Sequence, residues 1–154
     1  MMEVTGHAVV PAPLESVWEL VCDTSRYAEW VEGTDEVTRT DGPAARGSTY
    51  DEVNPILGPW RAKTEWTVTD FEPPRRMVHR GTGLPLSESF DVIFELSPEG
   101  DATGLTQTLR GKPAFGPVGA VFVRLMEGQV ERDNQKSVEN LAALAARELS
   151  PQRI

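Results

Sequence analysis

Residues 11–30 read PAPLESVWELVCDTSRYAEW, and they carry more information about the fold than any other part of the chain. Prolines end the preceding strand pattern, and Pro13 stands where the first turn of a helix tolerates proline. The apolar side chains that follow recur with the spacing of one helical face. They are Leu14, Val17, Trp18, Val21 and Cys22. Tyr27 and Trp30 then predict a short second helical turn, so this stretch indicates a strand, a compact amphipathic helix and an aromatic turn.

The C-terminal part of the chain predicts one long helix. Residues 118–148 contain no proline, and their apolar side chains repeat with helical spacing. At about 1.5 Å per residue, a helix over residues 117–148 would be about 48 Å long. Pro151 marks its end. The apolar face consists of Val118, Phe122, Met126, Val130, Val138, Leu141 and Ala145, and the opposite face carries Arg132, Lys136, Glu139 and Arg147.

Most residues between these helices are typical of antiparallel strands. Residues 60–71 give the clearest pattern, because two kinds of side chain alternate there with the period of a strand. One set is charged, so we expect the other set to face inward. The inward set is Trp60, Ala62, Thr64 and Trp66, and the outward set is Arg61, Lys63 and Glu65. Prolines and glycines separate further strands, which we expect at residues 3–10, 36–40, 48–54, 76–80, 89–96 and 103–110.

The composition bounds the class of protein. The chain has 154 residues, 39% hydrophobic and 25% charged, which predicts one globular domain over residues 1–154. The net charge is −9 and no basic stripe is present, so we expect no nucleic-acid partner. The longest apolar run, residues 115–126, is too short to span a bilayer. A single cysteine, Cys22, and an N-terminus without the features of a secretory leader predict a cytoplasmic protein.

Several segments together resemble a known family. Residues 11–23 and 26–31 carry the resemblance, and WTVTDFEPPRR (66–76) and NLAAL (140–144) support it. With the order of elements, they resemble the helix-grip fold of the START and Bet v 1-like superfamily, in particular its bacterial polyketide cyclase/dehydrase and lipid-transport (SRPBCC) branch. The resemblance implies an α+β fold in which a curved antiparallel sheet of about seven strands wraps a long C-terminal helix. It also implies an apolar cavity between the sheet and that helix.

Polar side chains within apolar faces are candidates for ligand contacts. Gln107 lies between two leucines on a strand pattern, and Asn134 lies in the apolar stripe of the long helix. Buried amides need hydrogen-bond partners, which a ligand, the backbone or water could supply. The aromatic side chains could line a pocket or fill a closed core. The expected lining is Tyr50, Trp60, Trp66, His79, Gln107, Phe122, Met126 and Asn134.

Three loops are expected to meet at one end of the sheet. Each combines glycine or proline with a bulky apolar side chain, and they span residues 55–59, 81–86 and 112–116. Leu57, Leu84 and Phe115 would then form the rim of a hydrophobic entrance. The alternative is that these loops fold over the edge of the core.

Little in the sequence indicates catalysis. His7 and His79 are the only histidines, they fall on different strands, and no metal-ligand or nucleophile motif is present. We therefore expect no metal and no cofactor, and we assign no catalytic residue; His79 is the remaining candidate for proton transfer. In aromatase/cyclase relatives, the resemblance implies an inward arginine on a central strand, whereas Arg61 here falls on the outward face.

These patterns predict a protein that binds a small hydrophobic molecule, such as a lipid, a polyketide or an aromatic metabolite, in an internal cavity. Apolar burial, at about 25 cal/mol per Å², would supply the affinity. One alternative is a polyketide cyclase/dehydratase-type enzyme that uses the same cavity. Another is a co-chaperone-like interaction module, which predicts a collapsed cavity. A monomer and a homodimer are both compatible with the sequence.

Overall fold

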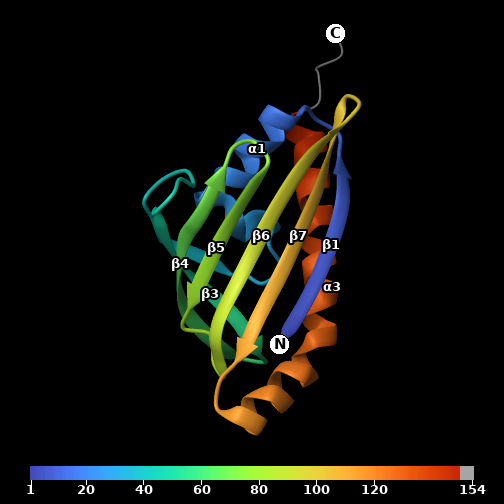
Figure 1. The fold of residues 1–154 in the computed structure, drawn as a ribbon. Helices are drawn as coiled ribbons and strands as arrows, with labels where there is room; N and C mark the ends of the chain where they lie inside the picture. Colours follow the sequence, from blue (N-terminus) through green and yellow to red (C-terminus); the bar gives the residue numbers. More distant parts are fainter. Residues whose placement is uncertain (150–154) are drawn as a thin grey trace.

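The computed structural model describes residues 1–149. In this part of the chain, seven strands form one antiparallel sheet in the order β1-β7-β6-β5-β4-β3-β2. One long helix packs along the sheet against β1 and β7 (Figure 1). The elements are β1 (Met2–Val10), α1 (Leu14–Cys22), η1 (Thr24–Arg26), α2 (Tyr27–Trp30), β2 (Glu36–Thr40), β3 (Thr49–Leu57), β4 (Trp60–Glu72), β5 (Arg76–Thr82), β6 (Ser87–Glu99), β7 (Ala102–Pro113) and α3 (Gly116–Glu148).

This arrangement confirms the predicted α+β helix-grip fold, with short helices after the first strand and a long helix after the last. The residues beyond 149, including the predicted helix terminator Pro151, lie outside the described part of the chain. Within residues 1–149, no helix combines the length and the apolar character that a membrane crossing requires.

β3 runs further than the sequence predicted. It was expected to end at Asn54 but continues through Pro55 to Leu57. Proline costs a sheet hydrogen bond only where a neighbouring strand needs the missing N–H. The pairing of β2 with β3 reaches only to Val53, so Pro55 lies beyond that neighbour. β6 likewise continues past Pro98, beyond the end of its pairing with β5.

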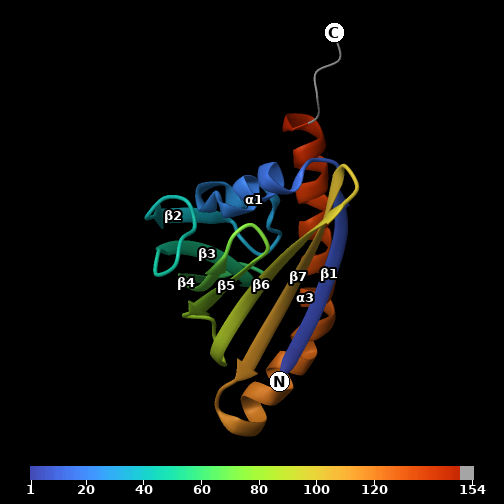
Figure 2. The same ribbon diagram turned by 45° about the horizontal axis from the view of Figure 1, so that its top comes forward.

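The core lies at the end of the sheet where α3 finishes. α1 and α2 cover this end, as the two views in Figures 1 and 2 show. The Tyr27 hydroxyl donates to the Val21 carbonyl oxygen at 2.7 Å and joins α2 to α1. Arg26 pairs with Glu148 at the end of α3, with 2.5 Å between Nη2 and Oε2. The apolar side chains buried here include Val10, Val17, Val21, Trp30, Leu105 and Leu141.

α3 is packed unequally along its length. Its second half holds almost all of its buried side chains, namely Asn134, Ser137, Val138, Leu141, Leu144 and Ala145. Its first half leaves Val121 and Leu125 exposed. Val118, which the sequence placed on the buried face, is also exposed, and that prediction was wrong. The helix begins beyond the end of β7 in Figure 1, so its first turn has no strand to pack against.

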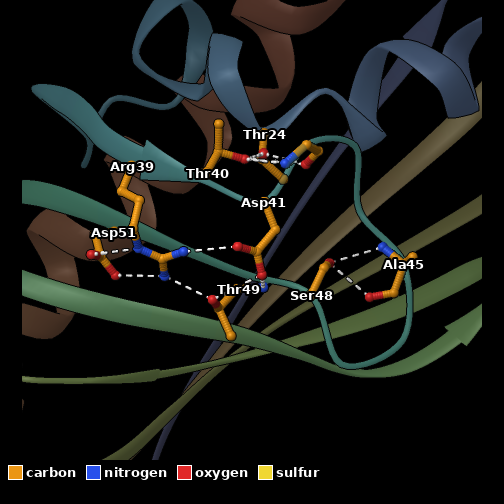
Figure 3. A network of polar contacts seen from close by, with 9 residues as sticks. Thr24, Arg39, Thr40, Asp41, Ala45, Ser48, Thr49 and Asp51 are labelled. Atoms are coloured by element: carbon orange, nitrogen blue, oxygen red, sulfur yellow. Dashed lines mark hydrogen bonds and ion pairs between the residues drawn. The ribbon is translucent and has the colours of Figure 1, made fainter.

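A polar network holds the β2 edge of the sheet (Figure 3). The Arg39 guanidinium donates to Asp51 Oδ2 at 3.0 Å, to Asp41 Oδ1 at 2.9 Å and to Thr49 Oγ1 at 2.7 Å. Asp41 also accepts the backbone N–H of Thr49 at 2.8 Å, and this bond is the main reason that its pKa is lowered. The network therefore ties β2 to the start of β3.

Candidate ligand-binding cavity

A cavity of about 220 Å³ lies between the sheet and the middle of α3. An apolar cavity of about 150 Å³ admits benzene in another protein, so this space can hold a guest of at least that size. Most of its wall is apolar. The apolar side chains in the wall include Met2, Val31, Ile56, Leu84, Phe90, Val92, Phe94, Leu109, Phe122, Val123, Met126 and Val130.

Two periodicities in the sequence build this wall. Alternation along β6 brings Phe90, Val92 and Phe94 to one face of the sheet. Four-residue spacing on α3 brings Phe122 and Met126 to the helix face opposite. The apolar stripe and the apolar strand face therefore enclose the same space.

The structure brings most of the sequence-predicted lining residues together. Tyr50, Trp66, Gln107, Phe122, Met126 and Asn134 are all in the wall. Trp60 is not: its indole is 45% exposed and its ring centroid lies 6.5 Å from that of Phe122, outside the enclosed space. Trp60 is the first residue of β4, where the strand has just left a turn, so its side chain covers the outer part of α3.

The second and third loops meet at the end of the sheet where α3 begins, and Pro55 and Ile56 of the first loop lie in the same cavity wall as Leu84 and Pro85 of the second. The Ala114 backbone N–H donates to the Leu86 carbonyl oxygen at 2.9 Å and joins the second loop to the third. Leu84 lies in the cavity wall. Leu57 and Phe115 are exposed and lie outside the wall. Together with the exposed side chains of α3, they make the outside of this end of the molecule apolar.

His79, the candidate for proton transfer, lies behind the wall. It is fully buried, and its Nδ1 is 2.5 Å from the Tyr50 hydroxyl, which does belong to the wall. Its ring also packs against Phe94, with 5.1 Å between the centroids. Burial lowers the pKa of His79 to about 3, so the imidazole is neutral at physiological pH. A guest in the cavity would therefore meet Tyr50 and not the imidazole.

Glu52 is a wall residue that sequence reasoning missed. Its side chain is 5% exposed, and its Oε1 accepts hydrogen bonds from Thr34 Oγ1 and Asn54 Nδ2, both at 3.1 Å. Burial raises its pKa to about 7, against the lowering effect of these two bonds. The alternation of side chains along a strand could have identified it. Glu52 lies two residues from Tyr50 on β3, so a prediction that places Tyr50 inward also places Glu52 inward.

A chain of hydrogen bonds connects Glu52 to the aromatic wall. Asn54 Nδ2 also donates to the Gly33 carbonyl oxygen at 2.6 Å, and its Oδ1 accepts from the Thr64 hydroxyl. Trp66 Nε1 in turn donates to Thr64 Oγ1 at 2.8 Å. These bonds hold the carboxyl group and the Trp66 indole in fixed orientations on neighbouring strands.

The side-chain amides of Asn134 and Gln107 each bring an unpaired oxygen to the cavity wall. Asn134 Nδ2 donates to the Gln107 backbone carbonyl at 2.8 Å and joins α3 to β7. Within residues 1–149, neither Asn134 Oδ1 nor Gln107 Oε1 has a hydrogen-bond partner, although both atoms are buried. Unpaired buried polar atoms are uncommon and cost free energy, so these two mark the polar part of the wall.

The charged residues in the wall are acidic. Glu52 and Asp133 belong to it, and no lysine, arginine or histidine does among the residues that the structure describes. The same described residues contain no group of three or more histidine, cysteine or acidic side chains that could hold a metal ion. The geometry is therefore that of a mostly apolar pocket whose polar wall groups are acidic side chains, amides and hydroxyl groups.

We expect Gly81→Ala to destabilise the protein by about 1–3 kcal/mol through overpacking. A Cβ on Gly81 would lie 2.6 Å from the Trp66 ring. That ring is held by its bond to Thr64 and stacks on Tyr50 at 6.4 Å, so it cannot yield freely. Urea unfolding would measure the change. Gly33→Ala is the control, because nothing lies within 4 Å of the position that its added methyl group would take; equal effects of the two substitutions would refute the explanation.

Comparison with known proteins identifies a family that matches this chain and solved structures that share its fold. Residues 1–146 match the protein-family model for polyketide cyclase/dehydrase and lipid transport. An uncharacterized protein of Mycobacterium tuberculosis is 30% identical over 146 residues, which cover 90% of this chain and 98% of that protein.

Two crystal structures illustrate the shared fold. A protein of Thermus thermophilus superposes with a TM-score of 0.76 at 17% identity, covering 96% of this chain and 99% of that one. The Zhui aromatase/cyclase of a Streptomyces species superposes with a TM-score of 0.75 at 17% identity, covering 96% and 95%. At this level of identity the likeness concerns the fold.

Proposed function

Because the chain belongs to the polyketide cyclase/dehydrase and lipid-transport family, we propose that it binds a small apolar molecule in the cavity between the sheet and α3. The observation that carries the proposal is the cavity itself, about 220 Å³ of space with a mostly apolar wall. Burial of apolar surface stabilises a guest there by about 25 cal/mol per Å². Tyr50, Trp66, Phe122 and Met126 would supply much of the contact surface.

The structure supports binding more strongly than the two alternatives. For a cyclase-type enzyme the sequence offered His79 as the proton-transfer group, and His79 lies behind Tyr50 with a pKa of about 3, so it does not face the cavity. An interaction module of the co-chaperone kind predicts a collapsed cavity, whereas space remains here. Cys22 is a free buried thiol, which supports the proposed cytoplasmic location.

Filling the cavity tests the proposal. We expect Met126→Trp to weaken binding of the fluorescent apolar probe N-phenyl-1-naphthylamine at least tenfold, because the indole would occupy the space that the probe needs. Leu125→Trp is the matched control, since Leu125 is adjacent on α3 but 78% exposed, and it should leave the affinity unchanged. Undiminished binding by Met126→Trp would place the probe elsewhere and contradict the proposal. Native mass spectrometry of protein purified from its own host would then identify the natural ligand.

A further inference from the structure

We propose that Glu52 is the polar anchor of the cavity, and that the ligand carries a hydroxyl or amino group whose hydrogen the Glu52 carboxylate accepts. The inference rests on the proposed function and narrows it to one class of ligand. The same inference excludes ligands whose polar end is a carboxylate, sulfate or phosphate.

The first support is the unequal use of the two carboxylate oxygens. Both hydrogen bonds that Glu52 accepts end on Oε1, from Thr34 and from Asn54. Among the described residues, no donor reaches Oε2 within hydrogen-bond distance, and no lysine, arginine or histidine forms an ion pair with Glu52. A buried carboxylate that lacks donors is costly, so a donor brought by a guest would recover free energy.

The second support is that the other hydroxyl groups nearby are already paired. The Tyr27 hydroxyl donates to the Val21 carbonyl oxygen, and the Tyr50 hydroxyl is paired with His79. The cavity therefore offers Glu52 no spare donor from either aromatic neighbour. A hydrogen-bond donor for Oε2 is therefore left to the contents of the cavity, and the proposal assigns it to the ligand.

The third support is the sign of the charge in the wall. Asp133 on α3 is the second charged wall residue, and it is also acidic. The unpaired oxygens of Gln107 and Asn134 add two more acceptors to the same enclosure. An anionic guest beside the buried Glu52 carboxylate would face like charge in a medium of low dielectric constant, where repulsion is strong, and Asp133 would add to the negative potential from a partly exposed position. A guest with a donor group meets acceptors instead.

Three ligands of similar shape test the inference at pH 8, above the Glu52 pKa of about 7. They are 2-naphthol, 2-methylnaphthalene and 2-naphthoate, and calorimetric titration would give each affinity. For the unaltered protein, we expect 2-naphthol to bind roughly tenfold tighter than 2-methylnaphthalene, which corresponds to one hydrogen bond to a charged group. We expect 2-naphthoate to bind at least tenfold more weakly than 2-methylnaphthalene.

Glu52→Gln should remove most of these differences in affinity, because it keeps the acceptor for Thr34 and Asn54 but turns an N–H donor toward the cavity. The preference for 2-naphthol should fall to threefold or less, and 2-naphthoate should gain at least tenfold. Unchanged binding of 2-methylnaphthalene would show that the variant retains an intact cavity. Glu65→Gln, an exposed glutamate on β4, is the control and should change none of the three affinities.

The outcomes separate the two hypotheses. If 2-naphthoate binds the unaltered protein as tightly as 2-naphthol, or if Glu52→Gln leaves the affinity ratios among the three ligands unchanged, the anchor role is refuted while the cavity remains a binding site. If none of the three ligands binds, the proposed function fails and the anchor role fails with it.

Discussion

Glu52→Gln should stabilise the protein by about 3 kcal/mol at pH 8 and by little at pH 4. Burial raises the Glu52 pKa from 4.5 to about 7, and each pKa unit corresponds to about 1.4 kcal/mol of stability. Between these values the folded protein holds a proton that the unfolded chain has released. The contribution of Glu52 to the free energy of unfolding is therefore complete below pH 4.5, is lost as the pH rises to about 7, and stays lost above it. The glutamine side chain does not ionise, so the free energy of unfolding of the variant does not fall in this way as the pH rises.

The groups around Glu52 leave this expectation intact. Burial raises the pKa of Tyr27 and of Tyr50 well above 10, so both phenols stay neutral between pH 4 and pH 8. Asp133 on α3 is the other acidic group of the cavity wall, and no cation of the described residues shares that wall.

Urea unfolding of the unaltered protein, Glu52→Gln and the exposed control Glu65→Gln at pH 4, 6 and 8 would measure the effect. Other carboxyl groups also change the stability across this range, so the informative quantity is the difference between variants at each pH. A Glu52→Gln difference that stays constant from pH 4 to pH 8 would mean that the Glu52 carboxyl titrates normally in the folded protein.

Leu141→Ala should cost about 2–5 kcal/mol, whereas Leu125→Ala should change the free energy of unfolding by less than about 0.5 kcal/mol. Both leucines lie on α3, but Leu141 is 0% exposed and Leu125 is 78% exposed. Removing a fully buried side chain loses its transfer free energy and leaves a cavity, while removing an exposed one does neither. Because both substitutions give alanine on the same helix, the difference in helix propensity cancels.

Thermal and urea unfolding would measure both variants. Similar losses from the two substitutions would show that the first half of α3 packs against the rest of the protein as tightly as the second half does. A large loss from Leu141→Ala alone would assign the stability of the helix to its second half.

Local periodicity explains why much of the fold could be predicted. The face formed by Val17, Trp18 and Val21 is buried as its helical spacing required. The alternation from Ala62 to Trp66 places those side chains inward and the charged ones between them outward. Such patterns depend on neighbours in the sequence, and a single sequence contains them completely.

The wrong predictions concern residues whose environment depends on parts of the chain that are distant in sequence. Pro55 was expected to end a strand, but the length of β2 leaves it without a neighbour that needs its N–H. Val118 has the right helical spacing for burial, yet it is exposed in the first turn of α3, a helix that begins beyond the end of β7 (Figure 1). Both outcomes depend on the lengths of other elements.

The candidate site shows the same division. Apolar wall residues such as Phe122 and Met126 follow from helical spacing and were predicted. His79 was predicted for the lining together with Tyr50, but Tyr50 from another strand pairs with it and separates it from the cavity. Glu52 was overlooked because charged residues are rarely buried, and only the bonds from Thr34 and Asn54 show how this one is accommodated.

Because α3 is packed unequally along its length, different parts of this helix determine the shape of the cavity and the stability of the fold. Substitutions of the half-buried wall residues in the first half of α3, such as Phe122, Met126 and Val130, would alter the shape of the cavity with little loss of stability, whereas substitutions of the fully buried residues between 134 and 145 would threaten folding first. Under the binding function proposed above, selection can change which molecule fits the cavity by altering one end of a single helix, and homologues with nearly superimposable backbones are free to diverge in what they bind.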